Sequence, residues 1–306
     1  MGSALRPGPS PFDLEDDAAY AAWRADKLAR RARRADELIV DVGSALALTA
    51  AERATMLQAC ARWNMVVYRS RCGARDKSVA LAVGRQLGLL QLDGNWLADE
   101  DGVSSIQVSP ATKDHSGYIP YTDRPLGWHT DGYYHPQGQR IRAFVLHCVQ
   151  PAASGGENSL LDHELAYIAV RDASPRWLRA LMAPAAMTIP AREDAQGVAR
   201  AEQAGPVFSV DAHDGSLHMR YTARTRSIRW QDDATTLKAV AFLERLLAED
   251  NTDALRLRLG AGMGIVANNV VHARRAFADD AARPRLLYRA RYLDRTAGVE
   301  AKWLNG

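Results

Sequence analysis

The 306-residue sequence is poor in cysteine and in long apolar runs, and each shortage excludes a class of protein. Cys60, Cys72 and Cys148 are scattered and form no CxxC pair, which argues against a disulfide framework and a structural zinc site and suits a reducing cytoplasm. No apolar run approaches the ~18 residues of a membrane span, and the polar, proline-rich start lacks the apolar stretch of a signal peptide. We therefore expect an unprocessed, cytoplasmic protein with no membrane partner.

Net charge is also scarce, with 39 Lys and Arg against 36 Asp and Glu. Because this balance creates no strong positive field, we expect small molecules rather than nucleic acid as partners. Apolar residues make up 47% of the chain, which is enough for a substantial core. We predict a single domain over residues 11–306, preceded by a flexible N-terminus over residues 1–10.

The first part of the chain, to about residue 95, is predicted to be mainly helical. Residues 12–38 are rich in Ala, Arg, Asp and Glu, which indicates a surface helix. The segment 49–52 (TAAE) has the form of a helix capping box, and another helix is expected over residues 76–87. Residues 65–69 (MVVYR) predict a short buried strand between these helices.

From residue 103 onward, short runs with period-two alternation predict strands. Residues 141–149 carry apolar side chains on both faces, which indicates a strand covered on both sides, with His147 as a hydrogen-bonded core residue. Many short strands with wide insertions favour a sandwich or jelly roll over a parallel, doubly wound sheet. Further strands are expected over 255–259, 265–272 and 286–292, with a helical insert around 234–249.

A histidine and an aspartate stand two residues apart in the segment 127–136 (GWHTDGYYHP). Residues i and i+2 of an extended strand project to the same side, so His129 and Asp131 can bind one metal ion. His272, at the end of an apolar segment, can supply a third ligand. Two histidines and one carboxylate leave three coordination positions open, as in non-haem iron(II) oxygenases. Because an HxD triplet alone arises often by chance, the prediction depends on its context.

That context resembles the taurine dioxygenase-like (TauD/TfdA) family of Fe(II)/2-oxoglutarate-dependent dioxygenases over nearly the whole chain. The resemblance rests on WHTD at 128–131, GGEN at 155–158, NNVVH at 268–272 and RLLYR at 285–289. It implies a mainly β fold with flanking helices around a double-stranded β-helix (jelly roll, cupin-like) core. It also implies that the three residues above hold Fe(II), and that dioxygen and 2-oxoglutarate are consumed with release of succinate and CO2.

The resemblance assigns co-substrate roles outside the triad. Arg285 matches the family's arginine for the distal carboxylate of 2-oxoglutarate, and a guanidinium fork suits a carboxylate. Asn158 falls where the family usually has threonine. Three interpretations stay open: Asn158 supports the co-substrate, its neighbour Ser159 does so, or the two preceding glycines only turn the chain and Asn158 caps the turn. Arg274 matches the family's frequent HGR, with alanine at 273.

Cationic and aromatic residues near these motifs are candidates for binding the substrate, which we expect to be a small polar metabolite, anionic or zwitterionic. Arg289 shares one side of its strand with Arg285 and Arg291, and it matches a family position that can contact an acidic substrate group. Ion pairing, loop packing and a solvated basic face are the structural alternatives. The other candidates are Tyr133, Tyr134 and His135, together with Arg220, Tyr221, Arg224 and Arg226 in the basic stretch 218–230.

Asp131 limits the expected reaction, because related halogenases carry a small residue there so that chloride can bind iron. Hydroxylation is therefore the expected outcome, and desaturation and oxidative cleavage begin with the same step. Two alternatives stay open: the same barrel with manganese or zinc and no 2-oxoglutarate, or a non-catalytic small-molecule-binding protein. Relatives commonly form dimers or tetramers, so a homo-oligomer is compatible with the resemblance.

Overall fold

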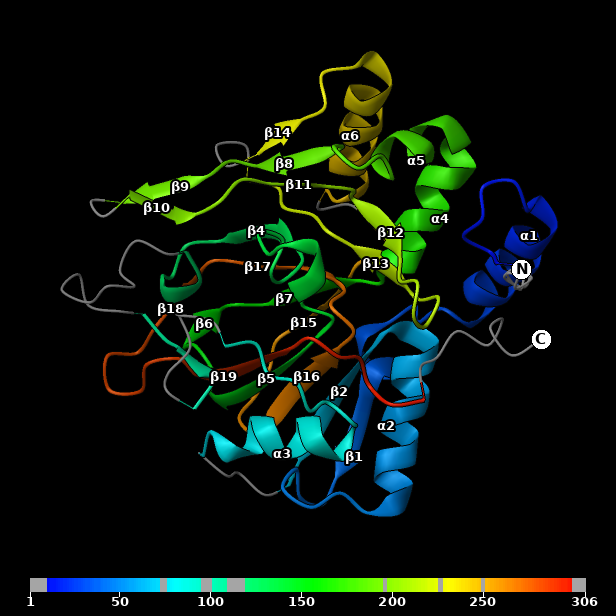
Figure 1. The fold of residues 1–306 in the computed structure, drawn as a ribbon. Coiled ribbons are helices and arrows are strands. Elements are labelled where there is room, and N and C mark those ends of the chain that lie inside the picture. The colour runs from blue at the N-terminus through cyan, green and yellow to red at the C-terminus, as the bar shows by residue number, and fades with distance from the viewer. Residues whose placement is uncertain are drawn as a thin grey trace, which may run out of the picture.

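Two large β-sheets enclose the centre of the protein, with helices on the outside (Figure 1). The computed structural model describes residues 10–71, 76–94, 101–108, 119–194, 197–224, 228–248 and 251–298. In order across the sheet, the larger one contains β1 (Ile39–Val42), β2 (Met65–Ser70), β16 (Met263–Ala267), β5 (Ala143–Gln150), β19 (Leu286–Tyr292) and β3 (Val103–Ile106). The smaller one contains β15 (Leu255–Leu257), β7 (Asn158–Leu161), β17 (Val271–Arg274) and β4 (Leu126–His129).

Helices cover the larger sheet and gather beyond the smaller one (Figure 1). α2 (Ala50–Trp63) packs on β2, and α3 (Ser78–Gln86) packs on β5 and β19. α4 (His163–Ala173), α5 (Pro175–Leu181) and α6 (Ala234–Leu246) pack together, and α1 (Asp17–Arg30) lies against α4. No helix among the described residues is both long and apolar enough to cross a membrane. The predicted fold class, mainly β with flanking helices around a jelly-roll core, is confirmed.

Short strands complete the β structure. They are β6 (Ser154–Gly155), β8 (Met187–Ile189), β9 (Arg192–Asp194), β10 (Gly197–Arg200), β11 (Gln203–Gly205), β12 (Phe208–Val210), β13 (Leu217–Met219), β14 (Arg229–Trp230) and β18 (Phe277–Ala278). β8, β11 and β14 form a small sheet near α6, and β9 and β10 pair as a hairpin beyond it (Figure 1).

Local signals correctly predict several N-terminal elements. Thr49 and Glu52 form the expected capping box at the start of α2, and β2 covers the predicted strand. The predicted helix over 12–38 is shorter in the structure, because the backbone becomes extended at Arg31. The predicted flexible stretch 1–10 lies almost wholly outside the described residues, which begin at residue 10.

Two features of the later part of the chain differ from the predictions. α6 matches the expected helical insert, but α4 and α5 are additional helices. The apolar segment 265–272 is two strands rather than one, because β16 lies between β2 and β5 of the larger sheet whereas β17 belongs to the smaller sheet. The chain changes sheets at Asn269, whose φ of 50° is left-handed.

β5 divides its side chains between two apolar layers, as the alternation predicts. Phe144 and Cys148 face the space between the sheets, and Val145 packs on the side of α2 and α3. His147 is buried, and its Nδ1 lies 2.8 Å from the Tyr68 hydroxyl, so it is the hydrogen-bonded core histidine that was expected. The layer between the sheets is where the candidate site lies.

A buried ion-pair cluster fastens α1 to the start of α4. The Lys27 ammonium lies 2.6 Å from Asp162 Oδ2 and 2.5 Å from Glu164 Oε2, and it donates to the carbonyl of Arg62. Burial alone would lower the pKa of Lys27, but the two carboxylates raise it overall. Burial would likewise raise the pKa of Glu164, and Lys27 instead holds it below its ordinary value. Lys27 and Glu164 are therefore both charged at neutral pH.

We expect Lys27→Met to lower the free energy of unfolding by about 3–5 kcal/mol at neutral pH, because it leaves buried carboxylates unpaired. Glu164 has a folded pKa below its ordinary value of 4.5, so this stabilisation is present above pH 4.5 and is lost as the pH falls through the folded pKa. Urea unfolding from neutral to acidic pH should show the gap between wild type and variant shrinking below pH 4.5. Arg30→Met removes an exposed ion pair with Asp26 from the same helix and should cost less than about 1 kcal/mol. Equal costs for the two variants would contradict this account.

Candidate metal centre and adjoining pocket

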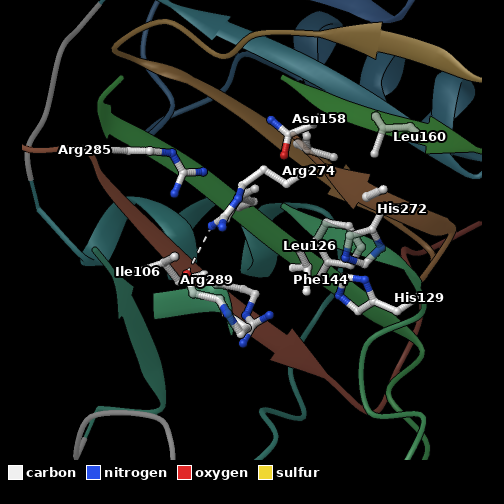
Figure 2. A pocket seen from close by; sticks show the side chains of 14 residues that line it. Ile106, Leu126, His129, Phe144, Asn158, Leu160, His272, Arg274, Arg285 and Arg289 are labelled. Atoms are coloured by element: carbon white, nitrogen blue, oxygen red, sulfur yellow. Dashed lines mark hydrogen bonds between the residues drawn. The ribbon is translucent and has the colours of Figure 1, made fainter. Parts of the chain in front are cut away.

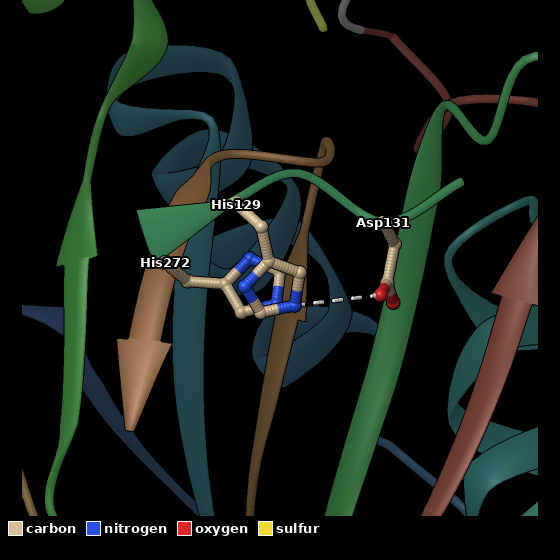
Figure 3. Close-up of side chains that lie close together, drawn as sticks. All are labelled: His129, Asp131 and His272. Atoms are coloured by element: carbon tan, nitrogen blue, oxygen red, sulfur yellow. Dashed lines mark ion pairs between the residues drawn. The ribbon is translucent and has the colours of Figure 1, made fainter. Parts of the chain in front are cut away.

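Three side chains converge between the two sheets (Figure 3). His129 ends β4, Asp131 follows two residues later, and His272 lies in β17. Antiparallel pairing places His272 directly across from His129, since these residues are partners in the register of the two strands. One ligand atom of each residue lies within 4.8 Å of the others. Strand pairing thus brings the two histidines together, and the turn after β4 adds Asp131, so the three residues that the sequence proposes as metal ligands meet.

Both imidazoles keep one nitrogen available for a metal ion. Nδ1 of His129 lies 2.9 Å from the carbonyl of Gly127, and Nδ1 of His272 lies 2.9 Å from the carbonyl of Val270. A carbonyl only accepts, so each Nδ1 carries the proton and each Nε2 offers its lone pair. Burial lowers the pKa of His129 to about 3 and also lowers the pKa of His272. Both rings are therefore neutral, as metal binding requires.

The Asp131 carboxylate uses only one of its oxygens within the protein. Oδ1 accepts a hydrogen bond from Arg289 Nη1 at 3.1 Å, whereas Oδ2 is buried and has no partner among the described residues. Burial alone would raise the pKa of Asp131, but the charges of Arg289 and Arg291 hold it well below its ordinary value. An ionised, unpartnered oxygen in a buried site requires a cation. Two neutral imidazoles and this carboxylate fit iron(II).

A pocket extends from the two histidines to Arg285 between the sheets (Figure 2). Phe144 from β5 and Leu160 from β7 give it apolar walls, so both sheets contribute. His129 and His272 lie at one end and Arg285 at the other, and Asn158, Arg274 and Arg289 also line the pocket. This shape suits a keto acid that chelates a metal ion through one end and carries a second carboxylate at the other.

Arg285 is a pocket cation with a terminal donor left for an anion. Its side chain is buried beside the ring of Phe277, 4.8 Å away, and its Nη1 has no partner among the described residues. Burial lowers the pKa of Arg285, but a guanidinium stays charged at neutral pH. Arg274, which also lines the pocket, differs because both of its terminal nitrogens donate to backbone carbonyls, which leaves only its Nε without a partner among the described residues. The free donor of Arg285 therefore matches a carboxylate.

Asn158 and Ser159 occupy opposite sides of β7. Asn158 lines the pocket together with Leu160 and Arg285. Ser159 does not line it, because successive residues of a strand point to opposite faces. Of the two residues considered for the co-substrate, the structure thus leaves Asn158 at the pocket and turns Ser159 away from it.

Arg289 and Arg291 share one side of β19, as its alternation predicts, and acidic residues neutralise both, whereas Arg285 directly precedes the strand. Arg289 lines the pocket and pairs with Asp131. Arg291 is buried, lies 2.5 Å from Asp93, and donates to the Tyr134 hydroxyl at 3.0 Å. The side of β19 that carries the arginines therefore points into the protein, where Arg289 contacts Asp131, a candidate metal ligand.

The other candidates for substrate binding lie away from the pocket wall. Tyr133 and Tyr134 pack edge to face, 5.3 Å apart, and against the apolar cluster around α4 to α6. His135 Nδ1 lies 2.9 Å from the carbonyl of Gln139. Arg224 is exposed, whereas Arg220 is buried and donates to four backbone carbonyls, which is a structural role. Tyr221 is a buried core residue, and Arg226 lies outside the described residues.

Sequence reasoning missed Asn269 as a residue of the site, although it noted the segment that contains it. Its carboxamide hydrogen-bonds both the N–H and the carbonyl of Asp131. Two consecutive asparagines within an apolar run were the available signal, because asparagine favours turns and tolerates left-handed backbone. The missed signal marks the corner where the chain changes sheets.

The chain is similar in sequence to known proteins. Residues 27–291 match the family described as "Taurine catabolism dioxygenase TauD, TfdA family". A uridine-5'-phosphate dioxygenase from an Amycolatopsis species is 32% identical over 204 residues, covering 60% of this chain and 71% of that protein. Its counterpart from a Streptomyces species is 33% identical over 199 residues, covering 63% of this chain and 69% of that protein.

Solved structures with a similar fold have much lower sequence identity. An asparagine oxygenase in complex with Fe(II), 2S,3S-3-hydroxyasparagine and succinate has a TM-score of 0.58 and 17% identity, covering 92% of this chain and 87% of that one. The non-haem iron oxygenase OrfP in complex with Fe and alpha-ketoglutaric acid has a TM-score of 0.55 and 16% identity, covering 83% and 87%. At this identity the likeness concerns the fold.

Proposed function

The chain belongs to the taurine catabolism dioxygenase TauD, TfdA family, and from this premise we propose that His129, Asp131 and His272 hold its iron. It is an Fe(II)- and 2-oxoglutarate-dependent dioxygenase that oxidises a small anionic substrate. One observation carries the metal assignment: two neutral imidazoles with available Nε2 atoms face a buried, unpartnered Asp131 oxygen. When bound, the iron supplies activation of dioxygen, coupled to conversion of 2-oxoglutarate to succinate and CO2.

Arg285 and Asn158 bind the co-substrate in this proposal. The Arg285 guanidinium pairs with the distal carboxylate, because a buried cation with an unused donor is stabilised by an anion. Asn158 lies at the same pocket and can donate a hydrogen bond from its amide. The apolar walls formed by Phe144 and Leu160 exclude water, which strengthens both interactions.

Arg289 fixes the Asp131 carboxylate and faces the substrate in this proposal. Its Nη1 bonds Asp131 Oδ1, which leaves Oδ2 for the metal ion, and its buried Nε has no partner among the described residues. An unused donor beside the metal centre can take an acidic group of the substrate. The role of Arg289 as a contact for an anionic substrate thus rests on this free donor.

For the substrate itself, we infer a small phosphorylated nucleoside. The two curated relatives above, at 32% and 33% identity, are uridine-5'-phosphate dioxygenases. A phosphate group is compatible with the Arg289 Nε beside the metal centre, which has no partner among the described residues. The expected reaction is hydroxylation, since Asp131 is retained as a carboxylate.

The test measures succinate produced by iron-loaded protein from 2-oxoglutarate and dioxygen with one candidate substrate at a time. We expect uridine-5'-phosphate to stimulate succinate formation and uridine, which lacks the phosphate, to do so far less. L-Asparagine and L-arginine are the matched amino-acid candidates, taken from the structural relatives. Stimulation by an amino acid and none by the nucleotide would contradict the substrate proposal.

A cytoplasmic location is part of the proposal, supported by the free thiols of the buried Cys60 and Cys148. The absence of nucleic-acid and membrane partners and the formation of a homo-oligomer stay predictions from the sequence.

A further inference from the structure

Asn269 occupies the corner at which the chain passes from the larger sheet to the smaller one. β16 ends at Ala267 and β17 begins at Val271, so the turn between them connects the two sheets three residues before His272. Asn269 is 2% exposed and has a φ of 50°, a left-handed conformation that asparagine tolerates. The turn therefore directs a buried, polar side chain into the protein.

The Asn269 carboxamide holds the main chain of Asp131 by two hydrogen bonds. Its Oδ1 accepts from the Asp131 N–H at 2.8 Å, and its Nδ2 donates to the Asp131 carbonyl at 3.0 Å. A third bond, from Nδ2 to the carbonyl of Ile141 at 2.6 Å, fixes the amide orientation. Both polar atoms of the side chain are thus used, and two of the three bonds converge on one residue that lies 138 positions earlier in the chain.

We propose that Asn269 is a positioning residue for the metal centre, which sets the distance between Asp131 and His272 without touching the metal ion. The inference rests on the proposed ligand set. His129 and His272 are already paired through β4 and β17, but Asp131 lies beyond the end of β4. The Asn269 carboxamide therefore holds the main chain of Asp131 to the turn before His272, whereas Arg289 holds its carboxylate. Groups that orient metal ligands typically change metal affinity about 10–100-fold when they are removed.

Asn64 provides a matched control elsewhere in the protein. It is also 2% exposed, and its φ of 58° is left-handed as well. Its carboxamide binds Asp162 and Arg295 and accepts from the Asn268 amide at 3.5 Å, but it makes no bond to Asp131. Replacing either asparagine with glycine preserves the left-handed backbone and removes the carboxamide. Asn269→Gly therefore removes the hydrogen bonds to Asp131, whereas Asn64→Gly leaves them in place.

The experiment titrates Co(II), as a spectroscopically visible substitute for iron, into metal-free wild type, Asn269→Gly and Asn64→Gly under anaerobic conditions. We expect Asn269→Gly to bind Co(II) about 10–100-fold more weakly with an altered visible spectrum, and Asn64→Gly to stay within about twofold of the wild type. Thermal unfolding of the metal-free proteins shows that both variants are folded. If Asn269→Gly does not fold, Asn269→Asp is used, because it keeps the acceptor and loses both amide donations.

Two results would overturn the inference: wild-type affinity and spectrum in the Asn269 variant, or an equal loss of affinity in Asn64→Gly. Failure of the ligand assignment is distinguishable from both. In that case His129→Ala and Asp131→Ala would bind Co(II) as the wild type does, whatever the behaviour of the Asn269 variant.

Discussion

Asp131→Ala is expected to abolish iron-dependent conversion of 2-oxoglutarate to succinate. The substitution removes the only carboxylate of the three candidate ligands and leaves the Arg289 guanidinium buried without its anion. A metal ion that loses one of three protein ligands loses several kcal/mol of binding, which corresponds to a decrease of about a thousandfold or more in activity at limiting iron. Succinate formation and iron content, measured on the same preparations, test this expectation.

Controls separate loss of the metal ion from loss of the fold. Asp232→Ala removes an exposed carboxylate and should leave iron content and turnover unchanged. His272→Ala should reproduce the effect of Asp131→Ala, whereas replacing the exposed His213 should not. Full iron content and turnover in Asp131→Ala would show that the metal ion is held elsewhere.

Arg285→Ala is expected to raise the KM for 2-oxoglutarate by on the order of 100-fold, because truncating one partner of a buried, charge-assisted pair costs about 3 kcal/mol. Arg274 lines the same pocket but cannot replace it, since its guanidinium is engaged by three carbonyls. The KM of Arg285→Lys should fall between those of the wild type and Arg285→Ala, because an ammonium keeps the positive charge but loses the two-pronged geometry of the guanidinium. Initial rates of succinate formation at varied 2-oxoglutarate give the KM.

Arg283→Ala is the matched control for Arg285, because it lies two residues away and its ion pair with Asp280 is exposed. Its KM for 2-oxoglutarate should equal that of the wild type. An unchanged KM in Arg285→Ala would mean that the distal carboxylate is bound elsewhere.

The parts of the site that follow from local geometry could be predicted from the sequence. His129 and Asp131 lie two residues apart, so their nearness follows from the sequence, although β4 ends at His129 and Asp131 lies in the turn after it rather than on the same strand. Strand alternation puts Arg289 and Arg291 on one side of β19, and Arg285 directly precedes the strand. Strand alternation alone did not show that Ser159 turns away from the pocket, because the sequence does not reveal which face of a buried strand lines the pocket.

The parts that depend on long-range contacts could not be predicted. The apolar run around Asn269 resembles one strand, because both halves are buried, although each half belongs to a different sheet. From the sequence, Arg220 resembles a residue that binds an anion. The carbonyls that accept its hydrogen bonds come from segments distant in the sequence, so the sequence does not reveal them. For α4 and α5, by contrast, local signals exist: Asp162 and Ser174 cap them, and Pro175 begins α5.

The most direct test of the proposed metal centre is a crystal structure of the protein with Fe(II) and 2-oxoglutarate, grown without oxygen and measured at the iron absorption edge. We predict one anomalous peak bonded to Nε2 of His129, Nε2 of His272 and one carboxylate oxygen of Asp131, with the distal carboxylate of 2-oxoglutarate against Arg285. An iron peak away from these three residues, or 2-oxoglutarate bound without contact to Arg285, would contradict the account.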